Sequence, residues 1–311
     1  MLAAVICLGA SVDVAGQTAN RSFQMALWPD TNPAVVPTPS DADIKTFWEL
    51  YGQPAAPARS IAFLQTWQSN TPLPSWDWSR ILAVQIDEPY ATALIGTFGG
   101  GIDLTQNPCH STAQMQVINA TAQKLATEAT MVKSNSPKTR FWVNFSGVEL
   151  GWMMDSTCPL ALNQPYIDVI SVDHYRAPFK PDVQVYYDWF IAHPPTSQQQ
   201  PQQQLALIPG TFFETGVDDP TTQATYLQGY FDYANSLNRN CNLALGSRGQ
   251  TFNFDGCRVW VVMGWLAGNF EDYVGLLDSR SAPIARAWRQ EARPTRGQIL
   301  NDVVFPVVLS Q

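Results

Sequence analysis

The segment Ile81-Leu-Ala-Val-Gln-Ile-Asp87, followed directly by Glu88-Pro89, sets the expected architecture. It is a nearly continuous apolar run of strand length, as in parallel strands that are covered on both faces. Similar runs alternate with segments of helical spacing, and this pattern favours a parallel α/β sheet. The other predicted strands are Phe23–Trp28, Ile61–Trp67, Phe141–Phe145, Ile167–Tyr175, Leu205–Phe213 and Val259–Trp265. The predicted helices are Asp41–Tyr51, Ala113–Ser134, Val183–Ala192, Thr221–Leu237 and Ala282–Ala292.

One barrel-sized domain fits the length and composition of the chain. With 311 residues, of which 45% are hydrophobic, the chain can bury a large core, and α/β barrels commonly have this size. We therefore predict a single (β/α)8 TIM-type barrel over residues 17–311. The predicted strands number seven, so the eighth would be Leu2–Leu8 or Val303–Leu309, unless one strand is irregular or missing.

The N-terminal segment has two interpretations. Residues 1–12 are apolar and small, and Val14 and Gly16 suit cleavage by signal peptidase. We predict that residues 1–16 are a signal peptide and that the mature chain is secreted. The alternative is that Leu2–Leu8 is a buried strand. The rest of the sequence has no run of the eighteen or so apolar residues that a membrane span needs, so we expect no membrane association.

The cysteines and glycosylation sequons also favour an oxidising compartment. Loss of Cys7 with the signal peptide would leave four cysteines, an even number. Cys241 and Cys257 bracket a Gly-, Asn- and Ser-rich loop, whereas Cys109 and Cys158 each follow a predicted strand and would bridge neighbouring loops. Sequons begin at Asn20, Asn119 and Asn144. Together these features predict a disulfide-bonded, secreted glycoprotein.

Composition narrows the expected partners. Charged residues make up 14% of the chain and aromatic residues 12%, which suits an uncharged, ring-shaped ligand such as a carbohydrate. The net charge of -8 would repel phosphate backbones, so nucleic acid is not an expected partner. The three histidines lack the paired spacing of a zinc site, and we expect no metal or cofactor. We expect the protein to be a monomer.

Acidic, amide and aromatic side chains follow the predicted strands where those strands end. In parallel barrels the functional groups gather at the C-terminal ends of the strands. Alternation along the first segment places Ala83, Gln85 and Asp87 inside the barrel, with Glu88 just beyond them. Pro89 is expected to restrict Glu88 to extended conformations. The residues at the other strand ends are Asn144, Asp173, Tyr175, Glu214 and Trp265.

This set of residues points to glycoside hydrolysis. The reaction needs one carboxylic acid to protonate the departing oxygen and a second carboxylate as nucleophile or base. Glu88 suits the acid, because the neighbouring charge of Asp87 favours its protonated form. Glu214 is the preferred second carboxylate, and Asp173 is the alternative.

Tryptophans and one histidine have separate interpretations. Trp67, Trp152 and Trp265 lie at strand ends or in the loops that follow, where they are candidates for stacking on sugar rings. Trp142 and Trp260 lie inside apolar strands and are predicted to pack in the core. His174 is expected to face the helices.

These motifs resemble the retaining β/α-barrel glycoside hydrolases of the cellulase and mannanase superfamily. In that group an Asn-Glu-Pro motif ends the fourth strand, and Asp87-Glu88-Pro89 is similar to it, with Asp in place of Asn. The resemblance implies that Glu88 is the acid/base, that Glu214 is the nucleophile, and that Tyr175 and Trp265 end the sixth and eighth strands. Asp87, Asn144, Tyr175 and the three strand-end tryptophans would then contact the sugar.

A second class of function is open. A barrel that kept the carbohydrate groove but lost the chemistry would bind glycans without cleaving them. Such a protein predicts that Glu214 lies too far from Glu88 to cooperate with it. A structural or interaction protein gives no reason for acids to gather at strand ends.

Overall fold

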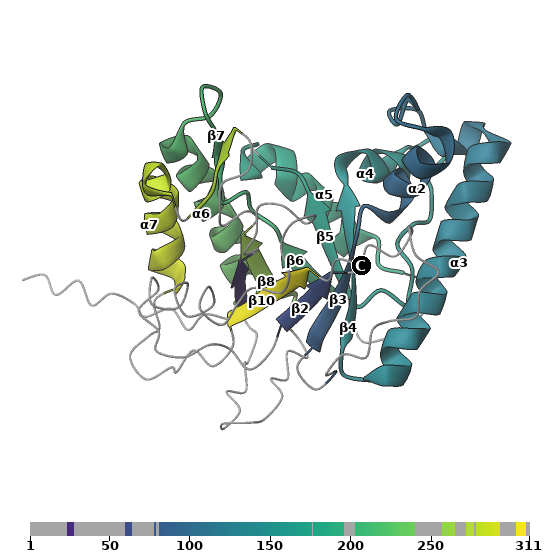
Figure 1. Cartoon of the computed structure of the whole chain (residues 1–311), viewed down its shortest axis with the longest axis horizontal. Helices are drawn as coiled ribbons and strands as arrows, with labels where there is room; N and C mark the ends of the chain where they lie inside the picture. Colours follow the sequence, from purple (N-terminus) through teal and green to yellow (C-terminus); the bar gives the residue numbers. More distant parts are fainter. Residues whose placement is uncertain are drawn as a thin grey trace, which may run out of the picture.

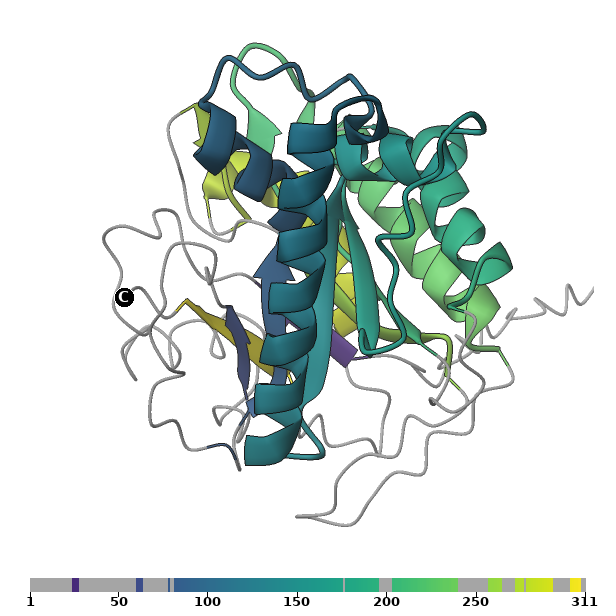
Figure 2. The same ribbon diagram turned by 90° about the vertical axis from the view of Figure 1, so that its right-hand side faces the viewer.

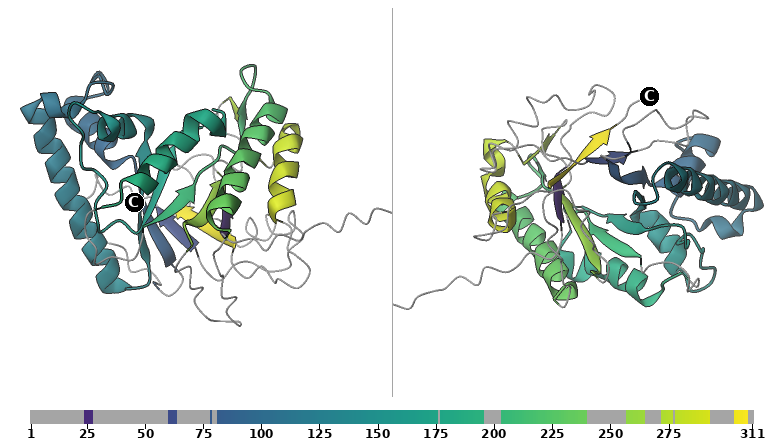
Figure 3. Two further views of the ribbon diagram at one scale, coloured as in Figure 1. Left: turned by 180° about the vertical axis from the view of Figure 1, so that it is seen from behind. Right: turned by 90° about the horizontal axis from the view of Figure 1, so that it is seen from below.

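The computed structural model describes residues 24–27, 60–63, 78, 81–175, 177–195, 203–239, 257–264, 272–276, 278–292 and 303–308. Its centre is a curled sheet of parallel strands with helices on the outer face (Figures 1 and 3). The strands of this curl are β3 (Ile81–Asp87), β4 (Arg140–Ser146), β5 (Val169–Asp173), β6 (Gln204–Leu207) and β8 (Val259–Gly264). Each pairs in parallel with the next in this order. The predicted parallel α/β sheet is therefore confirmed.

Helices cover the outside of the curl. The longest, α3, runs along the sheet beside β3 and β4 (Figure 2). The helices are α2 (Pro89–Phe98), α3 (Thr112–Asn135), α4 (Gly147–Met154), α5 (Gln184–Ala192), α6 (Pro220–Leu237) and α7 (Ala282–Ala292). Shorter helical turns are η3 (Pro108–His110), η4 (Phe179–Val183) and η5 (Ser279–Ser281). The predicted helix Asp41–Tyr51 lies outside the described residues.

Three short strands continue the sheet. They are β1 (Gln24–Leu27), β2 (Ser60–Phe63) and β10 (Val303–Val308). β2 pairs in parallel with β3, and β1 pairs with β8. β10 pairs with both β1 and β2, so the last strand of the chain lies between the first two. This order departs from the sequential order of the predicted barrel. The other candidate for the eighth strand, Leu2–Leu8, lies outside the described residues.

Alternating side chains divide the interior into two parts. Val84 and Ile86 of β3 belong to the apolar core that the sheet forms with the helices. Gln85 lies on the opposite, inner face and is fully buried. Also on the inner side, the indoles of Trp142 and Trp260 pack edge to face at 6.0 Å. The predicted alternation of β3 is thus confirmed, as is the packing role of these two tryptophans.

Two helices that the sequence analysis missed follow strands directly. α2 begins with Pro89 at its first position, where a missing N–H costs nothing. α4 begins with a capping box, in which the side chains of Ser146 and Glu149 bond each other's backbone N–H groups. The spacing Ser-x-x-Glu is the sequence signal for this start. The segment after β4 is therefore helical rather than a loop.

The predicted strand Leu205–Phe213 is too long. β6 ends at Leu207, because Pro209 has no N–H with which to continue the ladder. The chain then crosses to a separate ribbon, in which β7 (Phe213–Glu214) pairs antiparallel with β9 (Tyr273–Val274). This ribbon lies at the same end of the curl as α2 and α4 (Figures 1 and 2).

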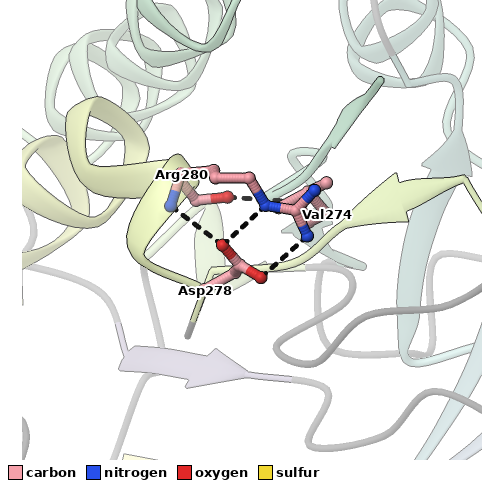
Figure 4. A network of polar contacts seen from close by, with 4 residues as sticks. Val274, Asp278 and Arg280 are labelled. Carbon is pink, nitrogen blue, oxygen red and sulfur yellow. Dashed lines mark hydrogen bonds and ion pairs between the residues drawn. The ribbon is translucent and has the colours of Figure 1, made fainter.

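The turn from β9 into α7 is held by polar contacts. The carboxylate of Asp278 accepts hydrogen bonds from the backbone N–H of Arg280 and from its guanidinium, at 2.9 to 3.0 Å. The hydroxyl of Ser281 donates to the carbonyl of Val274 at 3.1 Å (Figure 4). These bonds connect the ribbon to the helix that follows it.

A disulfide joins Cys109 and Cys158, as predicted. Cys257 is also disulfide-bonded, while its predicted partner Cys241 lies outside the described residues. The sequon at Asn144 is not an acceptor in the folded chain, because this residue is buried within β4. In the part of the chain that the structure describes, no helix is long and apolar enough to cross a membrane.

Replacing both Cys109 and Cys158 by Ser is expected to lower the free energy of unfolding by roughly 4 kcal/mol. The disulfide closes a loop between residues 49 positions apart, and its loss releases the unfolded chain from that constraint. Urea unfolding of the variant and the wild type measures the difference. An unchanged midpoint would show that the disulfide contributes nothing to stability.

Candidate active site

Three carboxyl groups meet at the C-terminal edge of the curl. Asp87 ends β3, Glu88 follows it, and Asp173 ends β5. β4 lies between these strands, with Asn144 aligned to Asp87 and Ser146 aligned to Asp173. The register of three parallel strands therefore brings together acids that are far apart in the sequence.

A row of hydrogen bonds beneath this edge orients Asp87. The indole N–H of Trp142 donates to Ser171 Oγ at 2.6 Å, and the Ser171 hydroxyl donates to Asn144 Oδ1 at 2.6 Å. The Asn144 amide in turn donates to Asp87 Oδ1 at 2.7 Å. Asn144 is 1% exposed and both ends of its amide are occupied. Asn144 therefore positions Asp87. The sequence had instead predicted that Asn144 contacts the sugar.

The backbone of Glu88 adopts a left-handed conformation, with φ 40° and ψ 52°. The expectation of an extended Glu88 is therefore wrong. Glu88 is the N-cap of α2, and its N–H donates to the carbonyl of Asn144 at 2.8 Å. A non-glycine residue held in this region costs on the order of 1–3 kcal/mol, and such strain is concentrated at functional sites. The turn carries the chain from strand to helix at the position of the candidate acid.

Burial is the main influence on the charges of this cluster. It raises the pKa of Glu88 to about 7, with a further increase from the charge of Asp87, and a hydrogen bond with Asp173 opposes both. Burial also raises the pKa of Asp173, as do the charges of Asp87 and Glu88 and the hydrogen bond with Glu88, whereas a hydrogen bond from Tyr175 lowers it. Burial raises the pKa of Asp87, which its bond from Asn144 lowers. All three pKa values are therefore raised, and that of Glu88 lies near neutral pH.

Tyr175 and His174 follow Asp173 and lie on different sides of the chain. The Tyr175 side chain hydrogen-bonds Asp173, and burial and the charge of Asp173 raise the pKa of its hydroxyl. His174 packs edge to face against Tyr186 of α5 at 5.6 Å. The prediction that His174 faces the helices is confirmed.

Glu214 occupies β7 rather than an end of the main sheet. Its N–H donates to Asp218 Oδ2 at 2.9 Å. Phe212, two residues earlier, packs edge to face against Tyr175 with ring centroids 5.7 Å apart. The hydrogen-bonded partner of Glu88 is nevertheless Asp173, the alternative second carboxylate of the sequence analysis.

One of the predicted sugar-stacking tryptophans is buried. Trp152 is 2% exposed in α4, and its indole N–H donates to the carbonyl of Leu104 at 3.0 Å. It packs in the core because the segment after β4 is a helix, so the prediction that it stacks on a sugar is wrong. Trp67 and Trp265 lie outside the described residues.

Glu149 is a buried acid that the sequence analysis did not single out. Its side chain accepts backbone hydrogen bonds from Tyr90, Ala91 and Ser146 at 2.7 to 2.9 Å. Burial raises the pKa of Glu149 to about 8, although these bonds lower it, and the charge of Glu88 adds to the increase. The capping-box spacing was the only signal in the sequence for a role of this residue.

The cluster offers a proton donor and an ionisable partner in direct contact, an arrangement suited to acid–base and nucleophilic chemistry. Among the described residues, no group of three or more His, Cys, Asp and Glu side chains is arranged to hold a metal ion. No known protein family and no curated protein matches the sequence.

Replacing Glu88 by Gln is expected to stabilise the folded chain at pH 8 but not at pH 4. The folded pKa of about 7 lies above the ordinary value of 4.5, so the folded state binds more protons than the unfolded state between these values. This contribution to stability is complete below pH 4.5 and is lost as the pH rises through 7. Gln does not titrate and avoids the loss. Urea unfolding at both pH values checks this, and an equal effect at the two would contradict it.

Proposed function

We propose that this chain is a glycoside hydrolase that cleaves a neutral polysaccharide or oligosaccharide with a pair of carboxyl groups. The hydrogen bond between Glu88 and Asp173, at the C-terminal edge of the curled sheet, carries the proposal. It joins two carboxyl groups whose pKa values are both raised, so the pair can hold a proton near neutral pH while both groups reach one glycosidic bond. The resemblance of Asp87-Glu88-Pro89 to the motif of the retaining barrel hydrolases supports the same assignment.

The two carboxyl groups take complementary roles in this reaction. Glu88 gives its proton to the glycosidic oxygen as the bond to the anomeric carbon breaks, and the Asp173 carboxylate forms an ester with that carbon. Water then attacks the anomeric carbon while Glu88 takes up a proton, and Asp173 leaves as a carboxylate. A direct hydrogen bond holds the carboxyls closer than the roughly 6.5–9.5 Å that inversion needs. The spacing therefore favours retention.

Glu214 is the alternative nucleophile. The family resemblance implies this role, and Phe212, two residues before it, contacts Tyr175. Asp173 is preferred because it is already bonded to Glu88. Under either assignment Asp87 stays a positioning and charge-tuning group, held by Asn144.

We propose that the fold is a TIM-type barrel with one irregular position. Counting Glu88's strand as the fourth makes β1, β2 and β3 the first, third and fourth strands, and β10 fills the second place. β4, β5, β6 and β8 then follow in order as the fifth to eighth. Functional groups gather at the C-terminal edge of such barrels, where the cluster lies.

The proposed setting is an extracellular one. We propose that residues 1–16 are a signal peptide and that residues 17–311 act as a single secreted domain and a monomer. The disulfide between Cys109 and Cys158 supports this setting, because such bonds persist in oxidising compartments. The net charge of -8 and the acidic site favour an uncharged glycan over an anionic one.

Release of reducing sugar from a panel of plant, fungal and bacterial polysaccharides tests the function. The proposal predicts release from at least one neutral glycan by the wild type and little release by Glu88→Gln. Equal release by both proteins would exclude Glu88 as the acid. No release by either protein, with both retained on one immobilised glycan, would establish the non-catalytic carbohydrate-binding barrel instead.

A further inference from the structure

The start of α2 presents a capping problem at the candidate acid. A helix leaves the N–H groups of its first turn without partners inside the helix, and the N-cap side chain usually supplies one. The N-cap of α2 is Glu88, and its side chain makes no capping hydrogen bond. Something else must therefore satisfy these buried donors if the Glu88 carboxyl is to remain free for chemistry.

Each N–H group of this first turn has a hydrogen-bond acceptor. Pro89 has no N–H, and the N–H of Thr92 donates to the carbonyl of Glu88 at 3.0 Å. The two that remain, from Tyr90 and Ala91, both donate to Glu149 Oε1, at 2.7 and 2.8 Å. One oxygen of Glu149 thus takes over the cap that the Glu88 side chain would otherwise provide.

The other oxygen of Glu149 is bound to the neighbouring helix start. Oε2 accepts the N–H of Ser146 at 2.9 Å, and the Ser146 hydroxyl accepts the N–H of Glu149 at 3.4 Å. Ser146 is the N-cap of α4, so this carboxyl joins the N-termini of the two helices that follow β3 and β4. The backbone hydrogen bonds from both helix starts lower the pKa of Glu149, against the larger effect of burial, which raises it.

We propose that Glu149 is the positioning residue for Glu88: by capping α2 in its place, it holds the left-handed turn and leaves the Glu88 carboxyl facing Asp173. Glu149 is fully buried, so it does not touch substrate. The inference rests on the proposed function for its kinetic consequence. Its structural consequence, at the amides of Tyr90 and Ala91 and at the Glu88 carboxyl, stands without that function.

Three variants separate this role from general stabilisation. Glu149→Ala removes every acceptor at this point, whereas Glu149→Gln keeps one oxygen for Tyr90 and Ala91 but replaces the acceptor of Ser146 by a donor. Glu128→Gln is the matched control, because Glu128 is a buried carboxyl on α3, where it pairs with Lys124 at 3.9 Å. If Glu149→Ala does not fold, Glu149→Gln carries the test.

The first readout is independent of any substrate. Amide hydrogen exchange of the full chain is expected to become about tenfold faster at Tyr90 and Ala91 in Glu149→Ala, with a smaller change in Glu149→Gln. The carbon-13 titration of the Glu88 carboxyl, which Asp87, Asp173, Tyr175 and Glu149 surround, is expected to move in both variants. Neither signal should change in Glu128→Gln. Unchanged exchange and an unchanged titration in a folded Glu149 variant would overturn the inference.

The second readout uses the glycan that the wild type cleaves. Displacement of a catalytic group by about 1 Å costs about a hundredfold in rate, so kcat of Glu149→Ala should fall about a hundredfold while KM stays within about twofold. A normal kcat, or a loss confined to KM, would contradict the role. If the wild type cleaves no glycan, the proposed function fails, and the exchange and titration results alone decide the role of Glu149.

Discussion

Replacing Asp173 by Asn is expected to lower kcat/KM on the cleaved glycan by at least about 10⁴-fold, because the amide cannot form the glycosyl ester. Asn keeps the size of the side chain and can still bond Glu88 and Tyr175, so the fold and glycan binding should be preserved. Steady-state rates of reducing-sugar release give kcat/KM, and retention on the immobilised glycan gives binding.

The matched comparison for this variant is Glu214→Gln. With Asp173 as the nucleophile, Glu214→Gln should retain activity within about tenfold of the wild type, since Glu214 lies on β7 outside the hydrogen-bonded pair. The reverse ranking, with Glu214→Gln inactive and Asp173→Asn active, would move the nucleophile to β7. The family resemblance implied that arrangement.

Glu88→Gln is expected to lower kcat/KM by about 10³-fold, the range that general acid catalysis contributes. Wild-type activity should also fall as the pH rises through about 7, because Glu88 loses its proton there. The residual activity of the variant should lack this limb of the pH profile. A substrate whose leaving group needs no protonation should be cleaved by the variant with a much smaller loss.

Two results would contradict the role of Glu88 as the general acid. A variant that keeps the wild-type pH profile would show that another group donates the proton. If Glu88→Gln lowers kcat/KM by the same factor for good and poor leaving groups, Glu88 supports the structure of the turn and does not donate the proton. Equal near-ultraviolet circular dichroism of variant and wild type controls for misfolding.

Much of the sheet follows from sequence pattern alone. The run Ile81–Asp87 forms β3 with the predicted bounds, and Ala282–Ala292 forms α7. In both segments the spacing of apolar residues is enough to predict the element, an apolar strand in the first and an amphipathic helix in the second. The alternation that turned Gln85 inward was predictable for the same reason, because side chains on a strand have a period of two.

Other elements depend on contacts that no local pattern contains. β10 pairs between β1 and β2, a place set by long-range closure of the sheet. α2 and α4 follow their strands without a loop, so their apolar residues merge with the strand signal. β6 ends early because Pro209 stops the ladder.

Part of the candidate site could also be predicted from the sequence, and part could not. The rule that strand ends carry function led to Asp87, Glu88 and Asp173, and the register of β3, β4 and β5 brings the three together. The left-handed turn at Glu88 and its cap were not predictable, because Glu149 lies 58 and 59 positions from the amides it binds. The buried place of Asn144 likewise depends on Ser171 of another strand.

The most direct test of the Glu88–Asp173 pair is a double-mutant comparison of kcat/KM on the cleaved glycan. Groups that act as one catalytic unit are far from additive when they are removed together. If Glu88 and Asp173 act as one unit, Glu88→Gln combined with Asp173→Asn is no less active than Asp173→Asn alone, and all three variants still bind the glycan. Losses that multiply in the double variant, or a single variant with near wild-type activity, would contradict a catalytic pair.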